Sequence, residues 1–180
     1  MIIIMGAVGS GKSEQTLRLA NRLHIPRIST SSVLKANLTP EFEAKMAVGD
    51  LVDDQEVIKL LDAELIKVGA DKNEFILDGS PRSVVQAEWL VGKIKDKSIK
   101  LGAIIKLNVS NEVVLGRMLK RGRDDDKKDI ILRRLDNYYK ITNPVVDYLR
   151  SHGITVHEVN GELTPDAVEA EIAKLLESRT

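Results

Sequence analysis

The eight residues from Gly6 to Ser13 constrain this chain more than any other stretch. They read Gly-Ala-Val-Gly-Ser-Gly-Lys-Ser and satisfy the pattern G-x-x-x-x-G-K-[ST] in full. The run Ile2–Met5 before them is apolar, as in a buried parallel strand. After them, side chains that can face a core recur at helical spacing over residues 16–23, and Pro26 ends the pattern. The sequence therefore predicts a strand, a glycine loop and a helix, the context in which this pattern binds phosphate.

The residue types of this loop fit a polyphosphate ligand. Gly6, Gly9 and Gly11 can adopt positive φ angles and let the backbone approach the ligand closely. Successive backbone N–H groups and the start of the helix present partial positive charge to it. Lys12 adds a full charge for the β- and γ-phosphates, and the Ser13 hydroxyl can reach Mg²⁺. The flanking strand and helix argue against the alternative, a glycine-rich turn followed by a chance Lys-Ser pair.

The rest of the 180 residues repeats the alternation of strand and helix. One domain is expected from the length. Further short apolar strands are predicted at residues 25–28, 75–78, 101–109 and 154–159. Two consecutive helices after the second strand, at 33–47 and 54–68, indicate an insert. We therefore predict an α/β fold, a P-loop NTPase-type five-stranded parallel sheet with helices on both faces. Later helices are predicted from residue 83, after residue 110, at 129–141 and from residue 165.

Local capping signals mark two of these helices. Asp53 and Glu56 form a plausible carboxylate cap pair, and Ser83 to Gln86 reads as a capping box. The helix after Ser83 carries Trp89, which could lie in the core or at a subunit contact, because helical phase alone does not decide between them.

Composition excludes several classes of function. The 27 basic and 27 acidic residues cancel, so no net positive field exists to recruit nucleic acid. Cysteine is absent, which excludes disulfides, thiolate chemistry and cysteine-ligated zinc. No apolar run approaches the roughly 20 residues of a membrane span, and the first residues show no basic segment or cleavage site. We therefore expect a cytoplasmic protein without nucleic-acid or membrane partners.

Asp78 closes the predicted strand at residues 75–78. Open α/β sheets bind their ligands at the carboxyl ends of the strands, so this carboxylate is a candidate for holding Mg²⁺ through water. The alternative is a strand-end carboxylate that caps the following loop. The neighbouring phosphate loop, with Lys12 and Ser13, favours the metal role. The three histidines show no ligand spacing and receive no role.

Arginines form a second group of candidates. Arg117 and Arg121 lie four residues apart on one predicted helix and share a face. Arg123 follows after one glycine, and Arg133 and Arg134 lie on the next helix. Single arginines are usually solvated, but several guanidinium groups converging on a phosphate loop are what phosphoryl transfer requires. The adjacent run 124–126 is entirely aspartate and either is solvated or orients these arginines.

Five segments spread along the chain match the motifs of one family in order. They are Ile28-Ser29-Thr30, Gly49-Asp50-Leu51-Val52, Leu77-Asp78-Gly79-Ser80-Pro81-Arg82 with Gln86, Lys120-Arg121-Gly122-Arg123-Asp124-Asp125, and Arg134-Leu135 with Tyr138-Tyr139. Over nearly its whole length the chain therefore resembles the adenylate kinases, a family of nucleoside monophosphate kinases. The resemblance implies reversible transfer of the γ-phosphoryl group of MgATP to AMP, giving two ADP.

The resemblance also implies roles for individual residues. The ATP group comprises Gly9, Ser10, Gly11, Lys12 and Ser13 at the phosphates, with Arg117 and Arg121 flanking adenine and phosphates. The AMP group comprises Thr30, Val52, Gly79 and Gln86 at the nucleoside, and Lys35 and Arg82 at the phosphate. Arg123 and Arg134 also contact AMP and close on the transferring phosphoryl group. The implied catalytic residues are Lys12, Arg82, Arg123 and Arg134, and the implied metal contacts are Ser13 and Asp78.

The resemblance implies a single domain with movable parts. The core would comprise residues 1–28, 61–121 and 135–180, with an AMP-binding insert at about 29–60 and a very short lid at about 122–128. AMP would be the acceptor substrate, ATP and Mg²⁺ would be bound, and the protein would be a monomer or a small homo-oligomer.

Departures from the family pattern keep two alternatives open. Lys35 replaces an arginine, which loses the bidentate geometry toward phosphate, and Ser80 replaces an aromatic residue. Val8, Ser13-Glu14 and Ser31-Ser32 also differ, and only Gly122 separates Arg121 from Arg123, so the lid is trimmed. The altered Lys35 leaves open a UMP or CMP kinase, which Thr30 disfavours. The short lid leaves open a nucleotide-binding sensor with little turnover.

Overall fold

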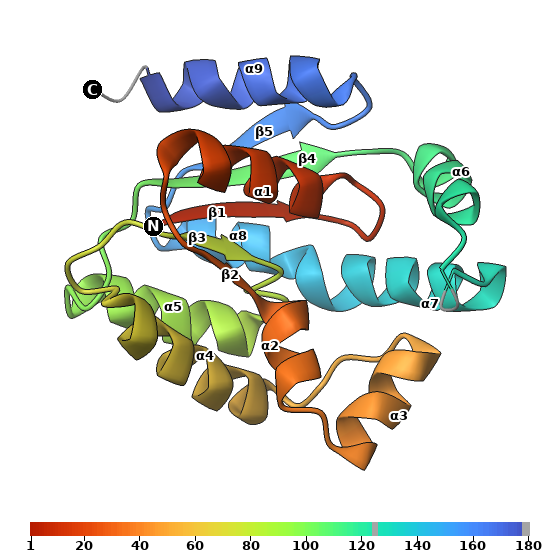
Figure 1. Cartoon of the computed structure of the whole chain (residues 1–180), viewed down its shortest axis with the longest axis horizontal. Coiled ribbons are helices and arrows are strands. Elements are labelled where there is room, and N and C mark those ends of the chain that lie inside the picture. The colour runs from red at the N-terminus through yellow and green to blue at the C-terminus, as the bar shows by residue number, and fades with distance from the viewer. Residues whose placement is uncertain (124–125, 178–180) are drawn as a thin grey trace.

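A computed structural model describes residues 1–123 and 126–177 of the chain, and its centre is a five-stranded, all-parallel sheet (Figure 1). The strand order is β2-β3-β1-β4-β5, and β1 lies in the middle with Ile4 beside Asp78 on one side and Ile105 on the other. All the predicted strands are confirmed, although several are shorter than predicted. Their bounds are β1 Ile2–Gly6, β2 Arg27–Ser29, β3 Ile76–Asp78, β4 Ala103–Asn108 and β5 Val156–Asn160.

Helices cover both faces of the sheet, as predicted (Figure 1). Because side chains alternate along a strand, Ile2 and Ile4 of β1 pack with α1 and α9, whereas Ile3 and Met5 belong to the core on the opposite face. The helices of the first face are α1 (Lys12–Leu23) and α9 (Pro165–Glu177). Those on the opposite face are α2 (Thr30–Ala36), α4 (Asp54–Val68), α5 (Val84–Lys95) and α8 (Pro144–Ser151). Beyond the carboxyl ends of the strands lie α3 (Pro40–Val48), α6 (Asn111–Arg121) and α7 (Lys128–Asn137).

Two predicted helices are wrong in their bounds. The single helix at 33–47 is two helices, α2 and α3, because Pro40 begins α3 and Thr39 caps it by accepting a hydrogen bond from the Phe42 amide at 3.2 Å. The helix at 129–141 ends as α7, and a π-helical turn, η1 (Tyr138–Thr142), follows. The chain then continues into α8, which the pattern did not predict, since Pro144 occupies the first turn of a helix rather than a break.

The capping predictions are partly confirmed. Asp53 caps α4 and accepts hydrogen bonds from the amides of Gln55 and Glu56 at 2.9 and 3.3 Å. Ser83 caps α5 through the Gln86 amide at 3.2 Å. The Gln86 side chain does not return the bond to Ser83, because its carbonyl oxygen accepts from other donors in the preceding loop. Only half of the predicted capping box is therefore present.

Trp89 lies between two helices of the core rather than on an open surface. Its ring is partly buried against the hydrophobic core, and its indole N–H donates to Oδ1 of Asp62 on α4 at 3.2 Å. Trp89 therefore packs against the core, as the first of the two alternatives predicts.

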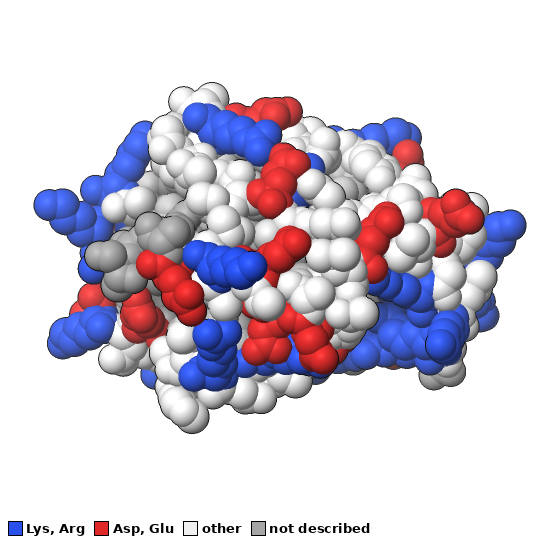
Figure 2. All heavy atoms as spheres, turned by 90° about the horizontal axis from the view of Figure 1, so that it is seen from above, with Lys and Arg blue, Asp and Glu red and all other residues white. Residues whose placement is uncertain are grey.

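Charges of both signs are interspersed over the face that carries α9 (Figure 2). Arg18 of α1, for example, contacts Asp166 and Glu169 of α9 at 2.7 and 3.0 Å. This mixture agrees with the net charge of zero. Among the described residues, no helix is long and apolar enough to cross a membrane.

Candidate active site

A cavity of about 750 Å³ opens at the carboxyl ends of the central strands. The phosphate loop forms one of its walls, and segments after β2 and β3 form the opposite wall. The structure brings every residue to which the family resemblance gave a role to this one cavity. They are Gly9, Ser10, Gly11, Lys12, Ser13, Thr30, Lys35, Val52, Asp78, Gly79, Arg82, Gln86, Arg117, Arg121, Arg123 and Arg134.

The phosphate loop has the backbone geometry that its glycines predict. Gly9 and Gly11 have φ angles of 71° and 91°, in the left-handed region that favours glycine. A Cβ atom at Gly9 would lie 2.9 Å from Cγ of Met118, so the loop packs directly on α6. Gly11 is the N-cap of α1 and has no side chain with which to cap it, which leaves the start of this helix directed at the cavity.

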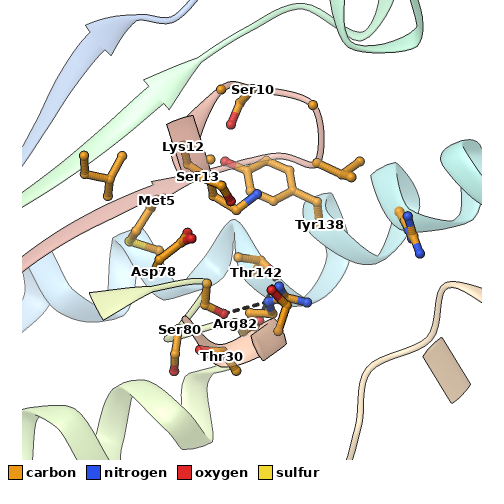
Figure 3. Close-up of a pocket in the computed structure, with 18 of the residues that line it drawn as sticks. Met5, Ser10, Lys12, Ser13, Thr30, Asp78, Ser80, Arg82, Tyr138 and Thr142 are labelled. Atoms are coloured by element: carbon orange, nitrogen blue, oxygen red, sulfur yellow. Dashed lines mark hydrogen bonds between the residues drawn. The ribbon is translucent and has the colours of Figure 1, made fainter. Parts of the chain in front are cut away.

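Lys12 is the lysine of this loop. Its Nζ donates to the carbonyl of Ala7 at 3.2 Å, so the ammonium group folds back over the loop (Figure 3). Burial lowers the pKa of Lys12 to about 8, the Arg82 charge acts in the same direction, and Asp78 opposes both. An anionic ligand beside Lys12 would reverse this shift, which is the behaviour expected of a phosphate-binding lysine.

Several buried polar atoms on the cavity wall lack hydrogen-bond partners. Within residues 1–123 and 126–177 these atoms are Oγ of Ser10, Oε1 of Gln15, Oγ1 of Thr30 and Oδ1 of Asp78, and all four residues line the cavity. Buried polar atoms are normally satisfied, and leaving one unpaired costs about 1–3 kcal/mol. Their concentration at one place indicates that a polar ligand completes them.

Asp78 uses one carboxylate oxygen for an ion pair and leaves the other without a partner. Nη2 of Arg27, on the neighbouring strand β2, donates to Oδ2 of Asp78. Nε of Arg27 donates to Thr16 at 2.9 Å, and the Thr16 hydroxyl donates to the carbonyl of Ser13 at 3.1 Å. This chain of contacts links the end of β3 to the start of α1. Sequence reasoning missed Arg27, because only the pairing of β2 with β3 brings it beside Asp78.

Arg82 dominates the wall opposite the phosphate loop (Figure 3). Its Nε donates to the carbonyl of Gly79 at 2.7 Å, and its own carbonyl accepts from the Thr142 hydroxyl at 2.8 Å. Burial lowers the pKa of Arg82, and the Arg134 charge adds to this effect while Asp78 opposes it. Gly79 has a φ angle of 88°, and a Cβ there would lie 3.2 Å from Nη2 of Arg82. Lys35 also lines the cavity, but its side chain is exposed.

The two arginines of α6 are held by defined partners. Nη1 of Arg117 donates to the carbonyl of Gly161 at 2.9 Å. Arg121 forms two hydrogen bonds to the buried Asp126, at 2.8 and 2.6 Å. These bonds lower the pKa of Asp126. Asp126 is therefore not solvated but orients an arginine, which was one of the two alternatives for the run 124–126. Asp124 and Asp125 lie outside the described residues.

Arg133 is the exception among the predicted arginines. Its guanidinium group forms an exposed bidentate contact with Asp50 at 2.7 and 2.6 Å and does not line the cavity. The expectation that it converges on the phosphate loop is wrong, because successive residues on a helix point about 100° apart. Arg134 does face the cavity, and its Nη2 lies 3.5 Å from the carbonyl of Met46. Asn137, one turn further along α7, donates to the carbonyl of Gly49 at 3.1 Å.

Comparisons with known proteins match this chain over most of its length. A family model described as Adenylate kinase matches residues 4–154. A protein named Adenylate kinase from Mycobacterium sp. is 38% identical over 164 residues, which cover 88% of this chain and 90% of that protein. Proteins of the same name from Mycobacterium bovis and Corynebacterium urealyticum are 36% and 35% identical, covering 97% and 86% of this chain and 98% and 88% of their own lengths.

Proposed function

The chain belongs to the adenylate kinase family, and from this premise we propose how its cavity transfers a phosphoryl group from ATP to AMP. It is a nucleoside monophosphate kinase, and its reaction converts ATP and AMP into two ADP. The comparisons give no support to a pyrimidine nucleotide kinase or to a sensor without turnover.

The phosphate loop binds the donor in this proposal. Gly9 to Ser13 surround the ATP phosphates with backbone N–H groups, and Ser10 finds a partner for its buried hydroxyl there. Lys12 leaves the Ala7 carbonyl and binds the β- and γ-phosphates. Arg117 and Arg121 lie on α6 at the same wall and flank the remainder of ATP.

The residues at the end of β3 fit a magnesium ion. Mg²⁺ in such sites takes one or two protein oxygens together with substrate phosphates and water. Among the described residues no cluster of three or more His, Asp, Glu or Cys side chains is present, so a cage made only of protein ligands is not available there. Ser13 and the unpaired Oδ1 of Asp78 would supply the protein contacts. Bound Mg²⁺ would neutralise charge on the β- and γ-phosphates.

The opposite wall binds AMP in this proposal. Thr30, Val52, Gly79 and Gln86 contact the nucleoside, and Arg82 with Lys35 binds its phosphate. No strong general base is required, because the attacking atom is already an anionic phosphate oxygen. The protein therefore contributes position and positive charge, which Lys12, Arg82, Arg123 and Arg134 supply around the transferring group.

We further propose that two segments move during the cycle. Residues 29–60 act as the AMP-binding insert, and residues 122–128 act as a very short lid, on a core of residues 1–28, 61–121 and 135–180. The insert contacts α7 through polar groups such as Asp50 with Arg133, which can separate without disturbing the core. A monomer or small homo-oligomer acting in the cytoplasm completes the proposal.

The observation that carries these assignments is the charge of the cavity wall. Within residues 1–123 and 126–177, seven cationic side chains line it against three carboxylates, and the buried unpaired polar atoms of the same ranges face the same space. Such an excess of positive charge favours a ligand with several negative charges. The basic residues are Lys12, Lys35, Arg82, Arg117, Arg121, Arg123 and Arg134, and the acidic ones are Glu14, Asp50 and Asp78.

The test is a coupled assay of ADP formation from ATP, Mg²⁺ and AMP, with UMP, CMP and GMP as parallel acceptors. We expect turnover with AMP to exceed turnover with every other acceptor. The variant Arg134→Ala should lose most of this turnover, whereas Arg133→Ala, on the same helix but away from the cavity, should keep most of it. Faster turnover with UMP, or full activity of Arg134→Ala, would overturn the corresponding assignment.

A further inference from the structure

The amide of Gln86 is fixed at both of its ends by neighbouring side chains and backbone. We propose that Asp54 and Ser80 are specificity-determining positioning residues, which hold this amide in one orientation so that it offers the acceptor base a single N–H donor. The inference rests on the proposed function, in which Gln86 contacts the base of AMP. Neither Asp54 nor the hydroxyl of Ser80 was assigned a role by the sequence.

Three hydrogen bonds define the orientation of the amide. Oε1 of Gln86 accepts from the hydroxyl of Ser80 at 2.8 Å and from the backbone N–H of Arg82 at 2.9 Å. Nε2 of Gln86 donates to Oδ1 of Asp54 at 2.8 Å. A backbone N–H group can only donate and a carboxylate can only accept, so exchanging the two ends of the amide would place donor against donor and acceptor against acceptor. The orientation is therefore set by chemistry.

The same three bonds determine which hydrogen-bonding group of Gln86 remains available to a ligand. A carbonyl oxygen has two lone pairs, and both already have donors, whereas the NH₂ group has two hydrogens, of which one is used within the described ranges 1–123 and 126–177. Gln86 is 2% exposed, and its remaining surface is part of the cavity wall. Thr30 lies on the same wall with its buried hydroxyl unpaired. The subsite thus presents one fixed donor beside a hydroxyl that can donate or accept.

A fixed donor selects bases by the atom at their pairing edge. Adenine carries a ring nitrogen with a lone pair at that edge, and cytosine carries an equivalent acceptor. Guanine and uracil carry an N–H group at the corresponding position, which would oppose the N–H of Gln86 and leave both donors unsatisfied. A buried unsatisfied donor is costly, and sites that hydrogen-bond a substrate group reject analogues lacking it strongly. The geometry therefore favours AMP over GMP and UMP. It discriminates less against CMP, because cytosine also carries an acceptor at this position.

Ser80 contributes to this arrangement only because it carries a hydroxyl. Its side chain is 2% exposed, and Oγ lies next to Oε1 of Gln86. An aromatic side chain at this position has no hydroxyl to donate, so Oε1 would keep only the bond from the Arg82 backbone. Asp54 holds the opposite end and, within the part of the chain that the structure describes, is the hydrogen-bond partner of Nε2. Loss of Asp54 should therefore have the larger effect.

The experiment compares Asp54→Ala, Asp54→Asn and Ser80→Ala with the matched control Asp53→Ala. Asp53 lies one residue away and caps the same helix, and its carboxylate accepts from the amides of Gln55 and Glu56. For each protein, kcat and KM for AMP and GMP are measured, together with equilibrium binding of AMP in the absence of ATP. A helix-end defect without a role in the subsite would appear equally in Asp53→Ala.

We expect Asp54→Ala to raise KM and the dissociation constant for AMP about tenfold, with kcat changed less than about twofold, the size of one hydrogen bond to a charged group. Its preference for AMP over GMP should fall by a similar factor. Asp54→Asn should retain most of the affinity for AMP and most of the preference over GMP, since the asparagine carbonyl oxygen can accept the bond from Nε2 of Gln86. Ser80→Ala should raise KM about threefold, and Asp53→Ala should leave the AMP to GMP ratio unchanged.

Two results would overturn the inference and leave the proposed function standing. One is an unchanged AMP to GMP ratio in Asp54→Ala; the other is an equal change in Asp53→Ala. Failure of the proposed function is distinct, because the unmodified enzyme itself would then show no preference for AMP.

Discussion

The two ends of the cavity are built in different ways. The donor end is one continuous segment, in which the buried strand β1 leads through the phosphate loop into α1. The loop is wedged against Met118 so closely that a Cβ at Gly9 would clash. The acceptor end includes the separate helices α2 and α3, and its turn at Gly49 and Asp50 reaches α7 through polar contacts, of which the Asp50–Arg133 pair is exposed.

This difference assigns separate tasks to the two ends. The donor end is rigid because buried apolar packing fixes it, so its backbone N–H groups are positioned before ligand arrives. The contacts between the acceptor end and α7 include an exposed ion pair, which contributes little stability and can exchange with solvent. We expect substitutions at the donor end to change catalysis strongly, and those at the outer contacts of the acceptor end to change substrate affinity weakly.

Lys12→Met should produce the largest effect. The variant removes a cation placed at the β- and γ-phosphates, and loss of one such electrostatic group costs roughly 10²–10³ in kcat. Steady-state assays measure this change, and the exposed Lys72→Met serves as a matched control. Thermal unfolding should show no loss of stability in Lys12→Met without ligand, because the lysine is held among other cations. A variant with more than a tenth of the normal kcat would contradict the rigid donor end.

Arg27→Ala tests whether the contacts of Arg27 with Asp78 and Thr16 stabilise the fold. The substitution leaves the buried carboxylate of Asp78 without its partner and removes the link through Thr16. Leaving a buried polar group unsatisfied costs about 1–3 kcal/mol, with charged groups at the upper end. Urea unfolding should show a loss of stability in this range, and Arg27→Lys should recover part of it. If Arg27→Ala unfolds at the same urea concentration as the unmodified protein, Asp78 does not need this ion pair.

The donor end could be predicted from sequence because its determinants are contiguous. The strand, the loop and the helix follow one another within the first 23 residues, and each has its own local signal. The family resemblance supplied the candidates on the opposite wall, and the structure brings them to the same cavity.

The contacts that hold these site residues in place could not be predicted, because they join residues distant in sequence. Arg27 meets Asp78 51 residues away, and Asp54 meets Gln86 32 residues away. Arg133 and Arg134 are adjacent, and only the packing of α7 decides which one faces the cavity. The break between α2 and α3 was missed because the apolar periodicity continues across it, although Pro40 marks the start of the new helix.

A smaller effect is the pH dependence of the free energy of unfolding, to which Lys12 at the donor end contributes. The pKa of Lys12 is about 8 in the folded protein and higher when unfolded. Between these values the unfolded state binds more protons, so this group makes the free energy of unfolding rise with pH. From pH 8 to pH 9 the unmodified protein should gain about 1 kcal/mol relative to Lys12→Met. Parallel urea titrations at the two pH values measure this difference, and a constant difference would contradict the lowered pKa.

The smallest effect is expected where the acceptor end meets α7. Arg133 lowers the pKa of Asp50, so their contact persists at neutral pH and is lost as the pH falls through that lowered value. Both side chains are substantially exposed, at 54% and 35%. Asp50→Asn and Arg133→Gln should each change KM for AMP by less than about threefold, as expected for an exposed ion pair.

The double variant of Asp50 and Arg133 makes this last prediction specific. If the two groups act on AMP binding only through each other, the double variant should have the same KM as either single variant. The difference from the unmodified enzyme should vanish near 1 M salt, where the screening length is about 3 Å. If the two substitutions multiply each other's effect on KM, or if kcat falls by more than about tenfold, the contact does more than support AMP binding and helps to position the catalytic residues. The acceptor end would then be as rigid as the donor end.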